Sequence, residues 1–177
     1  DEKEYIYSAY LEIAKKANFN KHKEIFNFLK INFINKGRNN IYQRMVESFK
    51  ISHLDLNDFL NIMRTHKPKN KFLTLPWFGK WNRLISCEFP IYLITNGNYI
   101  QQNNKINNLI LPKNSYFKKV IFANQYEPKP SSRSFQLLDN EFKLNDPIYI
   151  GDSEIDMHFA KNSCIEFINV NELINDF

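Results

Sequence analysis

Apolar runs of the length needed for a membrane-spanning helix are absent from the 177-residue chain. The charged first residues, DEKEYIYSAY, also lack the apolar stretch of a signal peptide. Cysteine is scarce, because only Cys87 and Cys164 occur, and their spacing does not suit a metal site. We therefore expect no membrane association, reduced thiols and a cytoplasmic location.

Recognition motifs for nucleic acid are absent too, and no basic stripe is interleaved with aromatic residues, so we expect no nucleic-acid partner. The net charge of +5 is nevertheless uneven. Residues 1–80 carry fifteen Lys and Arg against eight Asp and Glu, a net +7, and residues 81–177 carry nine against eleven, a net −2. The basic half either attracts an anionic substrate or is simply a solvated, Lys-rich helical surface.

Material for a packed core is plentiful, since 43% of the residues are hydrophobic and 15% are aromatic. Residues 1–72 predict an all-α domain, a bundle of four short helices, because their apolar residues recur three and four positions apart. Asp55 or Ser52 can cap the fourth helix. The apolar positions are Ile6, Tyr10, Ile13, Ala14 and Ala17; Ile25, Phe28, Leu29 and Phe33; Ile41, Met45, Val46 and Phe49; and Leu56, Phe59, Leu60 and Met63.

The apolar pattern changes in residues 73–177, where short buried strands alternate with helices. This alternation predicts an α/β domain with a three-layer, Rossmann-like core, in which helices cover both faces of a parallel sheet. Ligands bind at the carboxyl ends of the strands in such sheets, so the polar residues there are the candidate site. The expected strands lie in residues 89–97, 118–124, 147–152 and 165–170, and the expected helices in residues 81–85, 99–110, 131–142 and 153–163.

Polar residues follow the first two of these strands. Thr95, Asn96 and Gly97 form a turn whose hydroxyl and backbone N–H groups suit a phosphate-like anion. Lys129 lies between Pro128 and Pro130, which restrict its backbone and can hold a cation near a fixed point. Taken alone, the first is more typical of an ordinary turn, and the second of a surface lysine in a proline-rich loop.

Three carboxylates stand close together after the third strand: Asp152, Glu154 and Asp156. Asp152 is placed at the strand tip, where it can bind Mg²⁺ directly or through water. Asp156 follows one helical turn later, on the same side as Asp152, whereas Glu154 points elsewhere and is expected to be solvated. The alternative is an acidic first helical turn that merely complements the helix dipole.

The order of these residues along the chain is more specific than any one of them. IYLITNG, EPKP and YIGDSEID together resemble the second, third and fourth motifs of the haloacid dehalogenase-like hydrolase superfamily, most of whose members are Mg²⁺-dependent phosphatases. The helical residues then resemble the cap domain inserted after the first motif of that family. A glycine common after the fourth motif is replaced here by Cys164.

The resemblance implies roles for the candidate residues. Thr95, Asn96, Gly97 and Lys129 would bind the phosphoryl group, and Asp152 and Asp156 would be the carboxylates of the Mg²⁺ site. Thr95, Lys129 and Asp152 would be the catalytic residues. The substrate would be a small phosphorylated metabolite.

The first family motif, a strand that ends in DxDxT and carries the aspartate nucleophile, is absent from these 177 residues. We therefore expect a core that lacks its first strand, and a longer natural protein that supplies it. Two alternatives are a catalytically inactive relative that acts as a binding module, and an unrelated doubly wound domain of the receiver type. The late position of the acidic residues argues against the receiver.

Four further side chains, one histidine and three aromatic residues, were also considered. His66 is either an ordinary packing residue or a group near the mouth of the active site. Trp77, Phe78 and Trp81 are expected to pack the segment between the domains onto the core.

Overall fold

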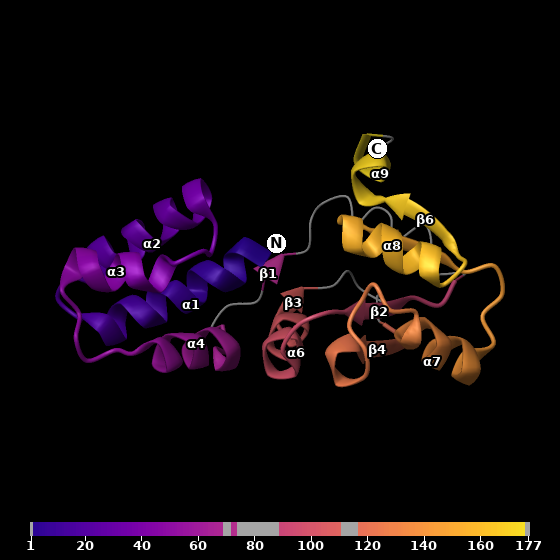
Figure 1. The fold of residues 1–177 in the computed structure, drawn as a ribbon, viewed down its shortest axis with the longest axis horizontal. Helices are drawn as coiled ribbons and strands as arrows, with labels where there is room; N and C mark the ends of the chain where they lie inside the picture. The colour runs from indigo at the N-terminus through magenta and orange to yellow at the C-terminus, as the bar shows by residue number, and fades with distance from the viewer. Residues whose placement is uncertain (1, 69–71, 74–88, 111–116, 176–177) are drawn as a thin grey trace. The chain divides into compact units, whose positions relative to one another are not determined.

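The computed structural model describes residues 2–68, 72–73, 89–110 and 117–175 (Figure 1). The chain divides into two compact units, one formed by Asp1–Leu73 with Asn103–Ile110 and the other by Thr74–Gln102 with Leu111–Phe177. None of the helices in the described residues is both long and apolar enough to cross a membrane. The predicted boundary between the helical domain and the α/β domain, between residues 72 and 73, stays a prediction. Trp77, Phe78, Trp81, Cys87 and the helix expected at residues 81–85 lie outside the described residues.

Four helices form most of the first unit, in agreement with the predicted bundle (Figure 1). They are α1 (Glu2–Ala17), α2 (His22–Lys36), α3 (Ile41–Phe49) and α4 (Leu56–Thr65). Their apolar stripes meet in one hydrophobic core, which stabilises helices too short to persist alone. Its fully buried members include Ile6, Tyr10, Ile13, Ile25, Leu29, Met45 and Leu54.

Asp55 begins α4 as its N-cap. Its carboxylate accepts a hydrogen bond from the backbone N–H of Asp58 at 2.7 Å, which satisfies one of the free donors of the first turn. Of the two predicted capping residues, Asp55 is therefore the one that caps.

His66 follows the last turn of α4 and is buried in the first unit. Its Nε2 lies 2.8 Å from Oγ of Ser8, and its Nδ1 contacts the carboxylate of Glu12, both on α1. The backbone carbonyl of His66 accepts hydrogen bonds from the hydroxyl of Tyr5 at 3.1 Å and from Nδ2 of Asn104 at 2.9 Å. These bonds satisfy the end of α4, so His66 is an interior packing residue.

The strands pair in parallel, as predicted. β2 (Tyr92–Thr95) pairs with β4 (Lys119–Phe122), and β5 (Ile148–Gly151) pairs with β6 (Glu166–Asn169). In the described part of the chain these pairs form separate two-stranded sheets, so β2, β4, β5 and β6 each have one unpaired edge. A single continuous sheet was expected, and the unpaired edges are where it is interrupted.

A third parallel pair was not predicted: β1 (Phe72–Leu73) pairs with β3 (Leu109–Ile110). The helix expected at residues 99–110 ends earlier, because α6 covers only Tyr99–Asn107. The side chain of Asn108 donates to the carbonyl of Asn104 at 2.8 Å and so competes with the backbone bonds of the helix. The prediction of helix for residues 108–110 was wrong, because Leu109 and Ile110 pair with β1 instead.

The second unit has its core between the two sheets and the helices α7 (Arg133–Phe142) and α8 (Glu154–Asn162). Ile94 of β2, Ile121 of β4, Leu138 of α7 and Phe159 of α8 belong to one buried cluster. A short 3₁₀ turn, η1 (Ala123–Gln125), follows β4, and a further helix, α9 (Val170–Asn175), follows β6; neither was predicted.

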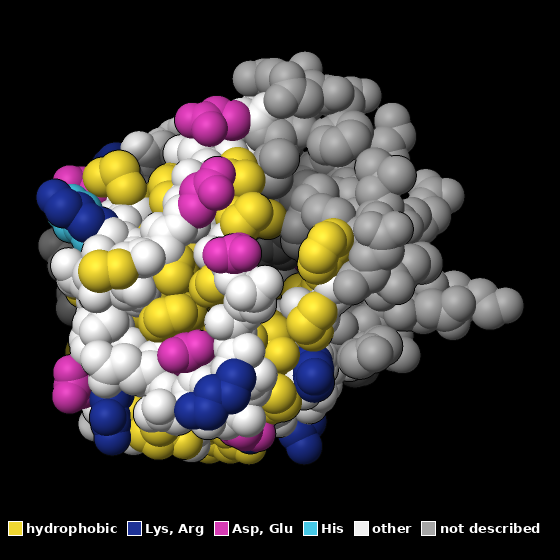
Figure 2. Space-filling view, turned by 90° about the vertical axis from the view of Figure 1, so that its right-hand side faces the viewer, with side chains coloured by type: hydrophobic (Ala, Val, Ile, Leu, Met, Phe, Trp, Pro, Cys, Tyr) yellow, Lys and Arg dark blue, Asp and Glu magenta, His cyan; other side chains and the backbone are white. Residues whose placement is uncertain are grey.

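The burial of β5 is incomplete, since Ile148 is 53% exposed and no residue of the strand is fully buried. Strands of parallel sheets are normally covered on both faces. Exposed hydrophobic side chains also lie between charged ones on the face drawn in Figure 2. Incomplete burial agrees with the unpaired edge of this strand.

Cys164 stands just beyond α8, in a left-handed conformation with φ +55°. Its N–H donates to the carbonyl of Lys161 and that of Ile165 donates to the carbonyl of Ala160, both at 3.1 Å, which is the Schellman pattern of helix termination. This position favours glycine. The structure therefore explains why a glycine would suit the place that Cys164 occupies.

Candidate functional site

The predicted site residues of the second unit lie on segments that follow β2, β4 and β5. Thr95 is the last residue of β2, and Asn96 and Gly97 follow it. Lys129 follows β4 and the turn η1, and Asp152 follows β5. Because parallel strands place their carboxyl ends at one edge of a sheet, polar residues far apart in sequence can meet there.

Asn96 holds the backbone of Lys129 through both groups of its side-chain amide. Its Oδ1 accepts from the N–H of Lys129 at 2.8 Å, and its Nδ2 donates to the carbonyl of Lys129 at 3.0 Å. Asn96 was predicted to bind phosphate through the backbone N–H groups of its turn, and no role was predicted for its side chain. In this arrangement the amide instead joins the end of β2 to the Lys129 loop.

The turn after β2 is also partly occupied by contacts within the protein. The N–H of Gly97 donates to Oδ1 of Asn124 at 2.6 Å, so it is not open to an anion in this arrangement. Gly97 has φ +115°, a conformation that other residues rarely adopt. The hydroxyl of Thr95 makes only a long contact, 3.3 Å, to the carbonyl of Asn96, and it is the group of this turn that remains most available to a ligand.

The ammonium group of Lys129 is buried against two polar partners. It lies 2.5 Å from Oδ1 of Asp156 and 2.9 Å from the hydroxyl of Tyr149. The side chains of Lys129 and Asp156 are only 10% and 9% exposed. A buried charge needs a paired and hydrogen-bonded partner, and each of these two ions supplies it for the other.

Asp156 accepts further hydrogen bonds at its second oxygen. Oδ2 accepts from Oγ of Ser153 at 2.6 Å, and Ser153 also caps α8 by accepting from the N–H of Asp156 at 3.3 Å. Burial alone would raise the pKa of Asp156. Hydrogen bonds from Lys129 and Ser153, the positive charge of Lys129 and a hydrogen bond from Tyr149 outweigh burial, so the pKa is lowered and Asp156 is ionised at neutral pH.

Gly151, the last residue of β5, makes the close packing of Asp156 possible. A Cβ at this position would overlap the Cβ of Asp156 and lie 2.7 Å from its Cγ. Glycine is therefore required for the first turn of α8 to approach the strand.

The predicted metal carboxylates differ in how free they are. Asp152 is exposed at the end of β5, whereas both oxygens of Asp156 already accept hydrogen bonds. Among the described residues, no three His, Cys, Asp or Glu side chains converge as a metal site. Mg²⁺ commonly uses only one or two protein carboxylates and keeps several waters, so a free Asp152 fits part of such a site.

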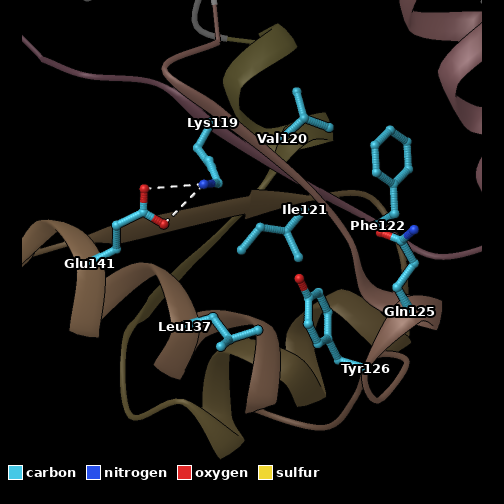
Figure 3. A pocket seen from close by; sticks show the side chains of 8 residues that line it. All are labelled: Lys119, Val120, Ile121, Phe122, Gln125, Tyr126, Leu137 and Glu141. Carbon is cyan, nitrogen blue, oxygen red and sulfur yellow. Dashed lines mark hydrogen bonds and ion pairs between the residues drawn. The ribbon is translucent and has the colours of Figure 1, made fainter.

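One cavity lies elsewhere in the second unit, along β4, and its volume is about 130 Å³ (Figure 3). Ile121, Tyr126 and Leu137 contribute to its lining, and an ion pair between Lys119 and Glu141, 3.0 Å apart, lies at one side. The cavity contains none of the predicted site residues.

Sequence reasoning missed Tyr149 and the structural use of Asn96. The alternation of side chains along β5 was the available signal for Tyr149, because residues 149 and 151 of a strand lie on the same face. Gly151 contacts Asp156, so that face is the one turned to the site.

Comparison with known families decides the affiliation. A family model described as haloacid dehalogenase-like hydrolase matches residues 1–170. The chain belongs to this family. As a haloacid dehalogenase-like hydrolase, the protein has the Rossmann-like α/β architecture predicted from its strands, together with helical residues before the second motif.

A solved structure agrees with this fold. The crystal structure of a hydrolase from Streptococcus pneumoniae TIGR4 is similar with a TM-score of 0.51 and 14% sequence identity, over 97% of this chain and 91% of that one. Identity this low supports the fold alone. A comparison with curated protein sequences gives no match.

Proposed function

We propose that this haloacid dehalogenase-like hydrolase is, in its complete form, a Mg²⁺-dependent phosphatase of small phosphorylated metabolites. The observation that carries the proposal is the buried ammonium of Lys129, which Asp156 holds at the carboxyl end of the strands. A fixed cation at this place suits a phosphoryl group, since phosphoryl transfer depends on positioning and on charge stabilisation.

Three groups of this chain would act on the phosphoryl group. Lys129 and the hydroxyl of Thr95 would hold its equatorial oxygens, and Asp156 would keep the ammonium of Lys129 in place. The nucleophile would be an aspartate on a strand with the DxDxT pattern, which residues 1–177 do not contain. That aspartate would attack phosphorus in line, form an aspartyl phosphate and release the alcohol, and water would then hydrolyse the acyl phosphate.

Mg²⁺, when bound, would neutralise the repulsion between the attacking carboxylate and the phosphoryl oxygens. Asp152 would hold the ion directly or through water, together with the carboxylate of the nucleophile strand. Asp156 would act on the ion only through ordered water, because its oxygens already accept three side-chain hydrogen bonds.

The uneven charge of the chain supports the proposed substrate class. Residues 1–80 carry a net +7, which supports the attraction of an anionic small molecule. We propose a phosphorylated metabolite and no nucleic-acid or membrane partner.

The test is the hydrolysis of an aryl phosphate by a form of the protein that includes a DxDxT strand. We expect activity that needs Mg²⁺, is abolished by EDTA, and falls by about two orders of magnitude or more in Asp152→Asn. Glu154→Gln is the matched control, because Glu154 is an exposed carboxylate two residues away that is not assigned to the site. Activity that survives both EDTA and Asp152→Asn would refute this mechanism.

A second function is compatible with the same buried pair of Lys129 and Asp156, because an ammonium group held in place can bind an anion without turning it over. The protein would then be an inactive relative that binds a phosphorylated ligand or a partner protein. Phosphate binding without turnover, together with an intact mass near 21.2 kDa for the native protein, would support this alternative. A larger native mass together with turnover would support the enzyme.

A further inference from the structure

Tyr149 stands between the two ions of the candidate site. Its hydroxyl accepts from Nζ of Lys129 at 2.9 Å and donates to Oδ1 of Asp156 at 3.0 Å. One phenol group therefore serves both ions at once. The Lys129 ammonium also lies 5.6 Å from the centre of the Tyr149 ring, within the range of a cation–π contact.

The position of this hydroxyl is fixed by packing. The ring of Tyr149 contacts the ring of Phe159 on α8, with ring centres 4.8 Å apart, and Phe159 is completely buried. Tyr149 itself is part of strand β5, which pairs with β6. A side chain held by a strand and a buried aromatic ring is a rigid support for its hydrogen-bond partners.

The phenol stays neutral throughout the physiological range. Burial raises the pKa of Tyr149 well above its usual value, and the negative charge of Asp156 raises it further. The hydroxyl can therefore keep donating to Asp156 while it accepts from Lys129.

An ammonium group has three N–H donors. Asp156 and Tyr149 use two of the three donors of Lys129, and they fix the direction of the third. Without the phenol, the ammonium would have Asp156 as its remaining described partner and could rotate about that single contact.

We propose that Tyr149 is a positioning residue that directs the third N–H of Lys129 toward an oxygen of a bound phosphate group. The proposal rests on the proposed function for one point alone, the identification of the bound anion as a phosphate group. The fixed orientation of the ammonium is a property of this chain and can be measured without a ligand.

Two measurements on the full chain test the proposal. The first is the affinity for inorganic phosphate, by isothermal titration calorimetry. The second is the NMR signal of the Lys129 ammonium in protein labelled with ¹⁵N-lysine, identified by its loss in Lys129→Met. In Tyr149→Phe we expect the Kd for phosphate to rise about tenfold, because a hydrogen bond to a charged group is lost, and the Lys129 signal to shift and lose protection from solvent exchange.

Tyr92→Phe is the matched control. Tyr92 lies in the same hydrophobic cluster, with its ring 5.1 Å from that of Phe142, and the described residues offer its hydroxyl no hydrogen-bond partner. We expect this variant to bind phosphate like the wild type and to leave the Lys129 signal unchanged. A merely structural role of Tyr149 would lower the melting temperature without moving that signal.

The outcomes separate the two proposals. If Lys129→Met abolishes phosphate binding but Tyr149→Phe changes neither the affinity nor the Lys129 signal, the positioning role is wrong. If wild type does not bind phosphate, or Lys129→Met binds it equally well, the proposed phosphate site is wrong, and the Lys129 signal alone decides the role of Tyr149. Should Tyr149→Phe not fold, 3-fluorotyrosine incorporation keeps the ring and changes the acidity of the phenol, and an unmoved Lys129 signal would then overturn the proposal.

Discussion

The ammonium of Lys129 and the carboxylate of Asp156 are in contact at 2.5 Å, and the two side chains are only 10% and 9% exposed. Loss of either ion would leave the other as an unpaired buried charge, which is strongly destabilising. The two residues are 27 positions apart, so the pair also connects the loop after β4 to the first turn of α8.

Removal of the carboxylate in Asp156→Asn should destabilise the protein by about 3 kcal/mol at pH 7, because Lys129 is left as a buried unpaired charge. Denaturant unfolding followed by circular dichroism measures this change. Glu154→Gln is the control, because Glu154 is an exposed carboxylate on the same helix. This variant should change the free energy of unfolding by less than about 0.5 kcal/mol. Equal effects of the two variants would contradict the pairing.

Acid should act through the same carboxylate. The pKa of Asp156 is lowered in the folded protein, so its contribution to stability is complete above the unfolded pKa of about 3.9 and is lost as the pH falls through the lower folded pKa. The free energy of unfolding of wild type should therefore fall between about pH 5 and pH 3, and Asp156→Asn should lose less over this range. If the free energy of unfolding depended on pH in the same way in both proteins, Asp156 would not be the group responsible.

Asn96→Asp should destabilise the protein by about 1–2 kcal/mol, because a carboxylate cannot donate to the carbonyl of Lys129 and two oxygens would face each other. Asn98→Asp is the matched control. Oδ1 of Asn98 accepts from the N–H of Gln101 at 3.2 Å, and an aspartate keeps that cap. Thermal melting of both variants is the measurement, and an equal loss would remove the special role of Asn96.

Cys164→Gly should stabilise the protein by about 1 kcal/mol, since glycine adopts the left-handed conformation at φ +55° without the steric cost that cysteine bears. Cys164→Ser should leave the stability nearly unchanged, because serine bears the same cost. Melting temperatures under reducing conditions test this. A destabilised Cys164→Gly variant would mean that the thiol makes contacts that outweigh the strain.

His66→Ala should lower the free energy of unfolding by about 2–3 kcal/mol, because the bonds to Ser8 and Glu12 are lost and a cavity forms. His53→Ala is the comparison, as His53 is exposed and makes one bond, of 3.2 Å, to the carbonyl of Lys16. We expect His53→Ala to change the free energy of unfolding by less than about 0.5 kcal/mol. Urea titration followed by the helical circular dichroism signal distinguishes the two, and similar losses would show that His66 is not buried in solution.

Much of the fold follows from local pattern. Apolar residues three and four positions apart predict α1 to α4, because a helix can bury them only on one face. The four longer strands and their parallel direction follow from the alternation with helices. The two-residue strands β1 and β3 could not be predicted, because their pairing joins residues 72 and 109 and leaves no periodic signal in either segment.

The sequence likewise predicts one part of the candidate site and leaves another part open. The residue types at the strand ends, Thr95, Lys129 and Asp152, and their order along the chain are properties of the sequence, and they are sufficient to indicate the family. Their individual roles in phosphate and Mg²⁺ binding stay predictions.

The sequence by itself determined which elements form and which polar residues stand at their ends, because both depend on neighbours within one or two turns. Only the tertiary structure decided where the hydrogen bonds of those residues go. Asn96 binds the backbone of a residue 33 positions away, and Tyr149 joins Lys129 to Asp156. Such partners are selected by distance and burial in three dimensions, because a buried polar group must be satisfied by whichever partner the fold brings within reach.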